Sequence, residues 1–381
     1  MDVFSGRWAY PTGWSDALPA WDGPATLVLV FGPSGLRDEP GHPGLADLRA
    51  AYPTASIAGC STSGEVSGSE LHDDTLTVAV LRFAATRVLV ETSPVSADDS
   101  RDVGLLLGKH LTDRAPDLAA VLVFSEGLRV NGSALADGLS AGVPLGTTVV
   151  GGLAGDGDRF AATWVLVDGV PVGGHVIAVG LAGDAVEVGH GARGGWSVLG
   201  PERIVTRSRG TVVHELDDRP ALELYRTYLG DRASGLPATA LLFPLGVRAP
   251  GGDRESVRTV LGVDPAEQSL TFAGEVPVGS RAQLMRSSTD RLVGAAEEAA
   301  EAARLAVAPG DSLALVVSCV GRRLVLGQRC EEELEAVAEA LGDGGPAPAT
   351  VGFYSYGELT SGDAGATMQN QTMTVSVIRE R

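Results

Sequence analysis

Short, uninterrupted apolar runs recur along the chain, and most of them end at glycine, proline or another turn residue. A short run of β-branched and other apolar residues is typical of a buried strand, and apolar alternation is typical of a strand with one buried face. The clearest run is 26–31, which Gly32 and Pro33 close. By these criteria the sequence predicts strands at 26–31, 74–83, 86–93, 119–124, 147–150, 163–167, 175–181, 239–243, 257–262, 269–273, 282–286, 312–318 and 372–378.

Other segments carry apolar residues three and four positions apart, which is the spacing of one helix face. Helices are predicted in this way at 44–52, 100–112, 133–141, 220–229, 289–307 and 331–341. Helix 289–307 is rich in alanine, which predicts close packing against a sheet. The order of elements is neither a strict β-α-β series nor a pure strand array, so we expect an α/β fold with mixed sheets and flanking helices.

Two glycine motifs, Gly59–Glu65 and Gly352–Glu358, share one pattern: Gly, four variable residues, Gly, Glu. Each follows a short apolar segment and precedes an alternating strand, and the run Gly151–Gly157 also leaves a β-branched strand. A recurring strand–loop–strand order indicates an internal pseudo-repeat, with chance likeness of glycine-rich loops as the alternative. We expect two domains, 25–213 and 214–381, behind an aromatic N-terminal extension, 1–24.

Composition restricts the partners of the protein. The chain has 381 residues, 44% of them hydrophobic, and a formal net charge of −19. A field of that sign repels nucleic acid and anionic lipid, so neither is an expected partner. No apolar run is long enough for a membrane helix, and the N-terminus does not read as a signal peptide. Three cysteines, an odd and small number, favour a reducing cytoplasm.

Standard catalytic motifs are missing from the sequence. It contains no zinc-protease His pair, no Gly-x-Ser-x-Gly elbow and no CxxC pair. We therefore expect that the protein is not an enzyme. The competing class is a hydrolase or transferase that uses Cys319 or Cys60 as a thiolate.

Candidate ligand-binding residues gather where strands end in glycine loops, since ligands of α/β proteins bind beyond strand ends. In the C-terminal half, Arg322 could clamp a carboxylate and Glu358 an ammonium group. Tyr354, Ser355 and Tyr356 would then surround the remainder of the ligand. This constellation is what an amino-acid-like zwitterion requires.

The same residues allow structural interpretations. Glu65 and Glu358 could only cap backbone amides or pair with an arginine, and one of the two alternating tyrosines could be a core residue. Arg322 and Arg323 cannot both point inward, so at least one is expected in solvent. The alternative site is the N-terminal glycine motif, where Ser61 and Ser63 would supply hydroxyls and Glu65 an anionic acceptor.

Several motifs together resemble the FIST sensory domain proteins, over about residues 25 to 380 and in the order of an N-terminal and a C-terminal FIST half. The motifs that carry the resemblance are Gly59–Glu65, Gly151–Asp156, Asp217–Tyr225, Ser318–Arg322, Gly352–Glu358 and Asn370–Thr372. Jointly they are specific, although each is weak alone. Cys319 and Asn370, which lie in these motifs, join the candidate ligand-binding residues.

The resemblance implies an intracellular ligand sensor in signal transduction, with amino acids as the proposed ligands. We expect no cofactor and a separate output partner, such as a histidine kinase or cyclase, and a homodimer stays open. Some relatives resemble haem-binding nitric oxide sensors, so haem is the alternative ligand, with His175, His190 or His214 as axial candidates. Gln369 stands where that family pattern suggests a histidine, a departure expected to alter ligand or haem chemistry.

Overall fold

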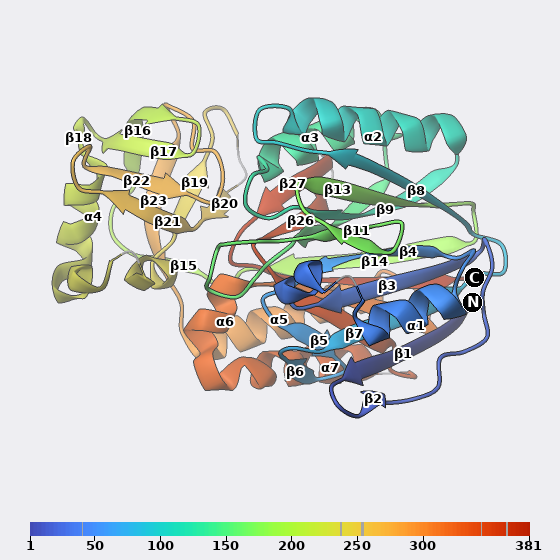
Figure 1. Cartoon of the computed structure of the whole chain (residues 1–381). Helices are drawn as coiled ribbons and strands as arrows, with labels where there is room; N and C mark the ends of the chain where they lie inside the picture. Colours follow the sequence, from blue (N-terminus) through green and yellow to red (C-terminus); the bar gives the residue numbers. More distant parts are fainter. Residues whose placement is uncertain (40, 237, 253–254, 344, 363–364) are drawn as a thin grey trace.

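Three mixed sheets surround a common core, and a smaller β domain lies at one end of the molecule (Figure 1). The computed structural model describes residues 1–39, 41–236, 238–252, 255–343, 345–362 and 365–381. Helices cover the outer faces of the sheets, so the expected α/β class with mixed sheets and flanking helices is confirmed. Among the described residues, no helix is long and apolar enough to cross a bilayer.

The first unit of the body spans residues 1–82. Its central strands β3 and β4 are parallel, β7 returns antiparallel beside β3, and β1 adds to the outer edge of β7. The loop after β4 sends out a short hairpin, β5–β6, before β7 begins. The elements are β1 (Asp2–Ala9), β2 (Gly13–Trp14), β3 (Thr26–Gly32), η1 (Ser34–Asp38), α1 (Pro43–Ala51), β4 (Ser56–Ser61), β5 (Glu65–Ser67), β6 (Glu70–His72) and β7 (Leu76–Arg82).

Two further units repeat this order. The second contains β8 (Arg87–Pro94), α2 (Ser100–Arg114), β9 (Leu118–Ser125), α3 (Gly132–Gly142), β10 (Thr148–Leu153), β11 (Val165–Val167), β12 (Val170–Val172) and β13 (His175–Ala182). The third contains β14 (Val186–Arg193), α5 (Thr289–Leu305), β24 (Ser312–Cys319), α6 (Val320–Leu326), η4 (Gly327–Arg329), α7 (Cys330–Gly342), β25 (Ala349–Ser355), β26 (Gly357–Gly362), β27 (Gly365–Gln369) and β28 (Met373–Glu380). The pseudo-repeat is thus confirmed, and it occurs three times.

Each unit completes its sheet with a hairpin from another unit. The β5–β6 hairpin pairs with β25, β26–β27 pairs with β10, and β11–β12 pairs with β4. The three strand orders are therefore equivalent: β6-β5-β25-β24-β28-β14, β27-β26-β10-β9-β13-β8 and β12-β11-β4-β3-β7-β1. This cyclic exchange of hairpins ties the three units into one body.

A glycine at the start of each glycine motif makes the strand pairing possible. A Cβ atom on Gly59 would lie 1.8 Å from the Val30 carbonyl oxygen, and one on Gly352 would lie 1.8 Å from that of Val316. Gly151 repeats the arrangement in the second unit. No side chain fits at such distances, so the recurrence of this glycine has a steric cause.

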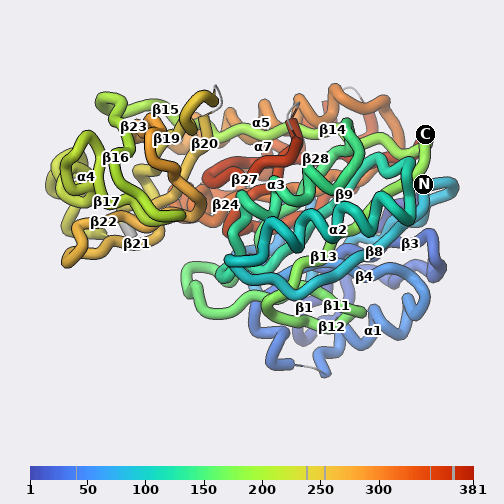
Figure 2. Tube along the Cα trace, turned by 90° about the horizontal axis from the view of Figure 1, so that it is seen from above, coloured from blue at the N-terminus to red at the C-terminus, as the bar shows by residue number. Residues whose placement is uncertain are grey.

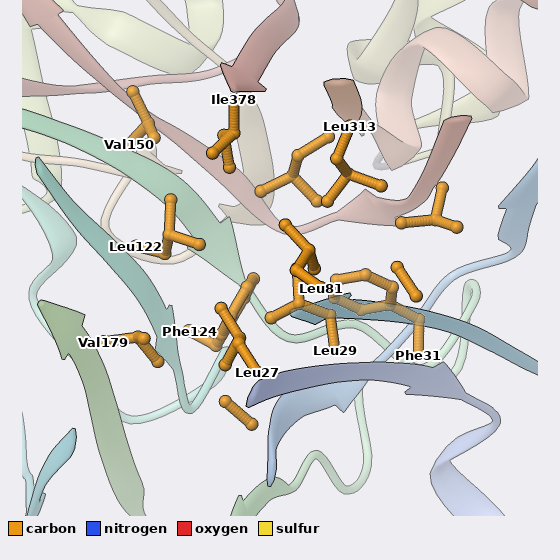
Figure 3. Close-up of a cluster of buried hydrophobic side chains, with 14 of the residues drawn as sticks. Leu27, Leu29, Phe31, Leu81, Leu122, Phe124, Val150, Val179, Leu313 and Ile378 are labelled. Atoms are coloured by element: carbon orange, nitrogen blue, oxygen red, sulfur yellow. The ribbon is translucent and has the colours of Figure 1, made fainter. Parts of the chain in front are cut away.

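The core lies where the three sheets meet (Figure 3). Phe31, Phe124 and Phe353, one from each unit, form an aromatic cluster with ring centroids 4.9, 5.5 and 6.1 Å apart. Aliphatic side chains from all three sheets surround the rings, including Leu29, Leu122 and Leu313. Burial of this shared apolar surface is the main force that holds the units together.

Small residues let the covering helices approach closely. The α2–α3 pair lies over one sheet (Figure 2), and a Cβ atom on Gly138 would lie 2.1 Å from the Arg101 carbonyl oxygen. On another sheet, Gly191 of β14 faces the Ala299 carbonyl of α5 at a comparable distance. The close packing predicted for the alanine-rich helix is confirmed.

The small domain is an insertion between β14 and α5 of the third unit. It forms a sheet of β20-β19-β23-β16-β17-β22-β21 with α4 at its far side (Figure 1). Its elements are β15 (Ser197–Val198), β16 (Arg203–Arg209), β17 (Val212–Leu216), β18 (Arg219–Pro220), α4 (Ala221–Leu229), η2 (Gly230–Gly235), η3 (Ala238–Leu242), β19 (Leu245–Arg248), β20 (Glu255–Arg258), β21 (Val260–Asp264), β22 (Ser269–Phe272) and β23 (Arg281–Arg286).

The structure groups the chain differently from the expected segments 1–24, 25–213 and 214–381. Residues 2–9 form β1, an integral strand of the first sheet, and residue 213 lies inside β17 of the insertion. One local prediction is wrong, since 239–243 is largely a 3₁₀ helix, and the sequence analysis missed strand β14 at Val186–Arg193. The glycines of β14 lie against α5, which explains why its sequence lacks a strand pattern.

Candidate functional site

A cleft of about 750 Å³ lies between the insertion and the body. Its walls come from the starts of α2 and α3, the ends of β10 and β24, and strands β21 and β22. The residues that line it are Ala97, Asp98, Arg101, Gly127, Leu128, Arg129, Val130, Asn131, Ala134, Leu153, Phe160, Arg209, Gly210, Thr211, Leu241, Thr259, Leu261, Thr271, Phe272, Ala273, Glu275, Cys319, Val320, Gly321 and Tyr356. A cavity of this size between two domains is typical of a small-molecule site.

Three arginines make part of the cleft cationic within a strongly acidic protein. Arg101, Arg129 and Arg209 are exposed, and within the described ranges none of their guanidinium groups forms an ion pair or hydrogen bond. The positive ends of the α2 and α3 dipoles point to the same region. Asp98 and Glu275 add two acids. Both charges of a zwitterion therefore have complementary groups in the cleft.

Polar side chains also line the cleft. Thr259 is 4% exposed, and its hydroxyl has no hydrogen-bond partner among the described residues. Asn131 donates from Nδ2 to Glu275 Oε1 at 2.8 Å, and its Oδ1 accepts from Ala134 N at 3.1 Å. An unpaired buried hydroxyl costs free energy, so a ligand that bonds to Thr259 would recover it.

Cys319 lies in the lining of the cleft, and Glu358 lies directly behind it. The Glu358 carboxylate accepts from Ser355 Oγ at 2.6 Å, from Thr372 N at 3.1 Å and from Thr372 Oγ1 at 2.7 Å. Burial raises its pKa to about 7. These bonds hold the glycine motif together and tie it to the residue before β28, so Glu358 braces the loop and does not face the cleft.

Glu65 has the same role in the first unit. It accepts from the Thr62 hydroxyl and from Thr75 N and Oγ1, both at 3.2 Å, and burial raises its pKa to about 7. In the second unit the equivalent strand position is occupied by Val165. Val165 pairs with Cys60 in the same way that Glu65 pairs with Phe353. The capping interpretation of both glutamates is the one that the contacts support.

Arg322 does not reach the cleft, which corrects the expected carboxylate clamp. Its guanidinium is 0% exposed and bonds to Glu333 Oε2 through Nη2 at 2.7 Å and Nε at 3.1 Å. The guanidinium also donates from Nη1 to the Gly194 carbonyl at 2.8 Å and from Nη2 to the Leu292 carbonyl at 2.7 Å. Residues 320–326 form α6 and not a loop, which turns this side chain into the body.

The two tyrosines differ in environment. Tyr354 is 0% exposed and donates to Glu333 Oε1 at 2.6 Å, so it belongs to the core and not to a ligand site. Tyr356 lines the cleft, donates to Asp156, and stacks on Phe160 with ring centroids 4.7 Å apart. Ser355 is fully buried, and among the described residues its side chain forms a hydrogen bond only with Glu358.

The serines of the first glycine motif are used in contacts between units. Ser61 Oγ accepts from Trp164 N at 3.1 Å, and Ser63 Oγ accepts from Gly157 N at 3.0 Å. Ser63 and Glu65 also line a separate hollow of about 430 Å³. Arg323 lies there, paired with Asp73 at 2.7 Å and 25% exposed, so it is less solvated than expected.

Asn370 is 0% exposed, and neither of its side-chain amide atoms has a hydrogen-bond partner among the described residues. It lies beside Gly357, where an added Cβ would be 3.4 Å from its Nδ2. It does not line the cleft. Its neighbour Gln371 has a φ of +62° and donates from Nε2 to the Leu241 carbonyl at 3.0 Å, which links β28 to the insertion.

The structure therefore brings Cys319 and Tyr356 to the cleft and leaves the other predicted residues behind it or elsewhere. The sequence analysis missed Arg101, Arg129, Arg209 and Phe160. These residues come from separated segments without a shared motif, and only the packing of the insertion against the second unit brings them together.

Haem and metal candidates do not gather at this site. No histidine lines the cleft among the described residues, and these contain no group of His, Cys, Asp or Glu that could hold a metal ion. His190 is buried, its Nδ1 lies 3.1 Å from Ser376 Oγ, and burial lowers its pKa to about 4. His175 Nδ1 lies 2.9 Å from the Gly173 carbonyl oxygen.

Two family models cover most of the chain: the FIST N domain matches residues 26–219 and the FIST C domain matches residues 221–361. The chain belongs to the FIST family, whose domains are signalling sensors. The change from one model to the next falls inside the insertion, six residues or more beyond the boundary expected at 213. No curated protein sequence matches the chain.

The solved structures that match the chain share little sequence with it and have low TM-scores. A chorismatase has 12% identity and a TM-score of 0.35, with 99% of this chain and 98% of that chain covered. A cyanuric acid hydrolase from A. caulinodans has 11% identity and a TM-score of 0.34, with 100% and 99% covered. Another cyanuric acid hydrolase has 11% identity and a TM-score of 0.30 over the same coverage. No activity or ligand carries over at these scores.

Proposed function

We propose that the protein senses a small carboxylate-bearing metabolite, an amino acid or a similar compound, which binds in the cleft between the insertion and the body. The observation that carries the proposal is the cluster of Arg101, Arg129 and Arg209 around a cavity of about 750 Å³. A guanidinium group binds a carboxylate through two parallel hydrogen bonds. Asp98 and Glu275 would receive the amine of an amino acid.

The position of the cleft supports a sensor. Its two sides belong to different domains, and the insertion joins the body on one side through the segment after β14 and on the other through the segment before α5. A ligand that contacts both sides would bind better to one relative arrangement of the domains than to others, and this difference can report its presence. We propose that the output goes to a separate signalling protein, such as a histidine kinase or cyclase.

We further propose that the protein is a cytoplasmic sensor without enzymatic activity or cofactor. Burial raises the pKa of the Cys60 and Cys319 thiols well above the usual range and that of Cys330 to about 11. Such thiols are protonated and poorly nucleophilic at neutral pH. The lack of histidine in the described lining of the cleft favours direct ligand binding over haem.

Calorimetry with a panel of amino acids and simple carboxylates tests the proposal. We expect saturable binding of at least one of them, and Arg129→Gln should weaken it at least tenfold, because a charge-assisted pair contributes about 1.5–3 kcal/mol. Arg226→Gln, an exposed arginine on α4 outside the cleft lining, is the matched control and should leave binding unchanged. Equal effects of both variants, or no binding by the whole panel, would exclude this site.

A further inference from the structure

An apolar groove lies next to the cleft along the insertion. It has a volume of about 690 Å³ and is lined by Asp158, Phe160, Gly235, Leu236, Thr239, Leu241, Leu242, Val260, Leu261 and Leu324. Phe160, Leu241 and Leu261 also line the cleft, so the two hollows lie next to each other. The arginines belong to the cleft alone, and Asp158 is the only charged residue in the described lining of the groove.

The groove exposes large apolar side chains that most proteins bury. Phe160 is 40% exposed, Leu242 39%, Leu261 45% and Leu324 41%. They come from the second unit, the insertion and α6, yet they gather in one groove. Single exposed apolar residues need no explanation, but a contiguous group next to a polar cavity marks a binding surface.

The backbone at Phe160 has an unusual conformation at the edge of the cavity. Its φ is +50°, a left-handed conformation that is costly for a bulky residue. Asp156 holds this turn, because its carboxylate accepts from the backbone N–H groups of Phe160, Ala161 and Ala162 at 2.8 to 2.9 Å. Tyr356 stacks on one face of the ring. A strained residue fixed by its surroundings at a cavity edge indicates a functional position.

We propose that the ligand of this protein is an amphipathic carboxylate, with its carboxylate among the cleft arginines and an extended apolar chain in the groove. The inference rests on the proposed function and narrows its ligand class. The distribution of charge supports this ligand class. Cationic side chains line the cleft, apolar side chains line the groove, and Phe160, Leu241 and Leu261 line both. A free small amino acid would fill only part of the cleft and leave the groove in water.

Straight-chain carboxylates from acetate to decanoate, below their micelle concentrations, test the inference by calorimetry on the full chain. Each methylene that enters the groove contributes about 0.8 kcal/mol, so affinity should rise about fourfold per added carbon until the groove is filled. Decanol and decylammonium, which have the same chain without the carboxylate, should bind at least tenfold more weakly than decanoate.

Three single variants separate the two halves of the site. Arg129→Gln should weaken all carboxylates by a similar factor, whereas Leu242→Gln, at a residue that lines the groove and not the cleft, should reduce the affinity for decanoate and leave that for acetate unchanged. Leu106→Gln is the matched control: Leu106 is 46% exposed against 39% for Leu242, and it lines neither hollow. Both leucines are partly exposed, so neither change should impair folding.

The outcomes distinguish this inference from the proposed function. Binding that is sensitive to Arg129→Gln but independent of chain length would overturn the amphipathic ligand and leave the carboxylate site in place. Absence of binding for every carboxylate, together with a negative amino-acid panel, would overturn both. A loss of chain-length dependence that is equal in Leu242→Gln and Leu106→Gln would overturn the assignment of the groove.

Discussion

The Glu333 carboxylate binds the Arg322 guanidinium in a pair from which solvent is fully excluded, with Oε2 2.7 Å from Nη2 and both side chains 0% exposed. The other oxygen of Glu333 accepts from Ser318 Oγ at 3.1 Å and from Tyr354 at 2.6 Å. This network joins α7, α6, β24 and β25. The arginine that the sequence suggested for ligand binding is a structural residue of the third unit.

Arg322→Met should therefore destabilise the protein without a specific effect on ligand affinity. Removing one partner leaves the Glu333 charge buried and unpaired, which costs about 3–5 kcal/mol. Arg323→Met is the control, because its pair with Asp73 is partly exposed and contributes no more than about 1 kcal/mol. Urea denaturation followed by circular dichroism measures both. Equal losses in the two variants would contradict the structural role of Arg322.

Glu65 and Glu358 should each make stability fall as pH rises from about 4.5 to 7, whereas His190, whose pKa burial lowers to about 4, acts in the opposite direction up to about pH 6.5. Burial raises the pKa of Glu65 and Glu358 from 4.5 to about 7, so in this interval the folded protein holds protons that the unfolded chain releases. The free energy of unfolding therefore decreases with pH, by on the order of 3 kcal/mol for each group.

Glu358→Gln tests this pH dependence. A neutral amide can point its oxygen to Thr372 and its NH₂ group to Ser355, so it keeps the bracing contacts. We expect stability between pH 4.5 and 7 to fall less with pH in this variant than in the wild type, and less again in the double variant with Glu65→Gln, in which the opposite effect of His190 remains. A slope that stays unchanged in both variants would show that other groups cause it.

Gly352→Ala should destabilise the fold by at least about 2 kcal/mol, because the new Cβ would meet the Val316 carbonyl oxygen at 1.8 Å and force the two parallel strands apart. Gly294→Ala is a control for which the opposite effect on stability is expected. Gly294 lies within α5 with no atom near its missing Cβ, so alanine should stabilise the helix by up to about 1 kcal/mol. Thermal unfolding measures the stability of the two variants. A similar melting temperature for both would refute the steric argument.

The three thiols should react slowly with iodoacetamide at pH 7.5 in the folded protein. Burial raises the pKa of Cys60 and Cys319 well above the usual range, so little thiolate is present. Mass spectrometry of timed samples measures the labelling, with urea-unfolded protein as the reactive control. Rapid labelling of Cys319 alone would favour the enzyme alternative, since this residue lines the cleft.

The sequence by itself determined most helices, the buried strands and the repeated glycine motif. These depend on local physics: apolar periodicity reports which face of an element is buried, and Gly352 is required wherever a neighbouring strand lies too close for a Cβ. The Glu of the motif also carries a local meaning, because Glu358 accepts from Ser355 within the same loop. A family resemblance followed from the same short segments.

Only the tertiary structure decided how the units join and where the cleft lies. The β5–β6 hairpin pairs with β25 nearly 300 residues away, and no periodicity within a segment encodes its partner. Arg322 and Arg129 show the consequence: the first lies in a motif but turns into the core on α6, and the second lies outside every motif but faces the cleft. A side chain's role depends on which distant surface covers it, and that surface is set by the packing of the whole chain.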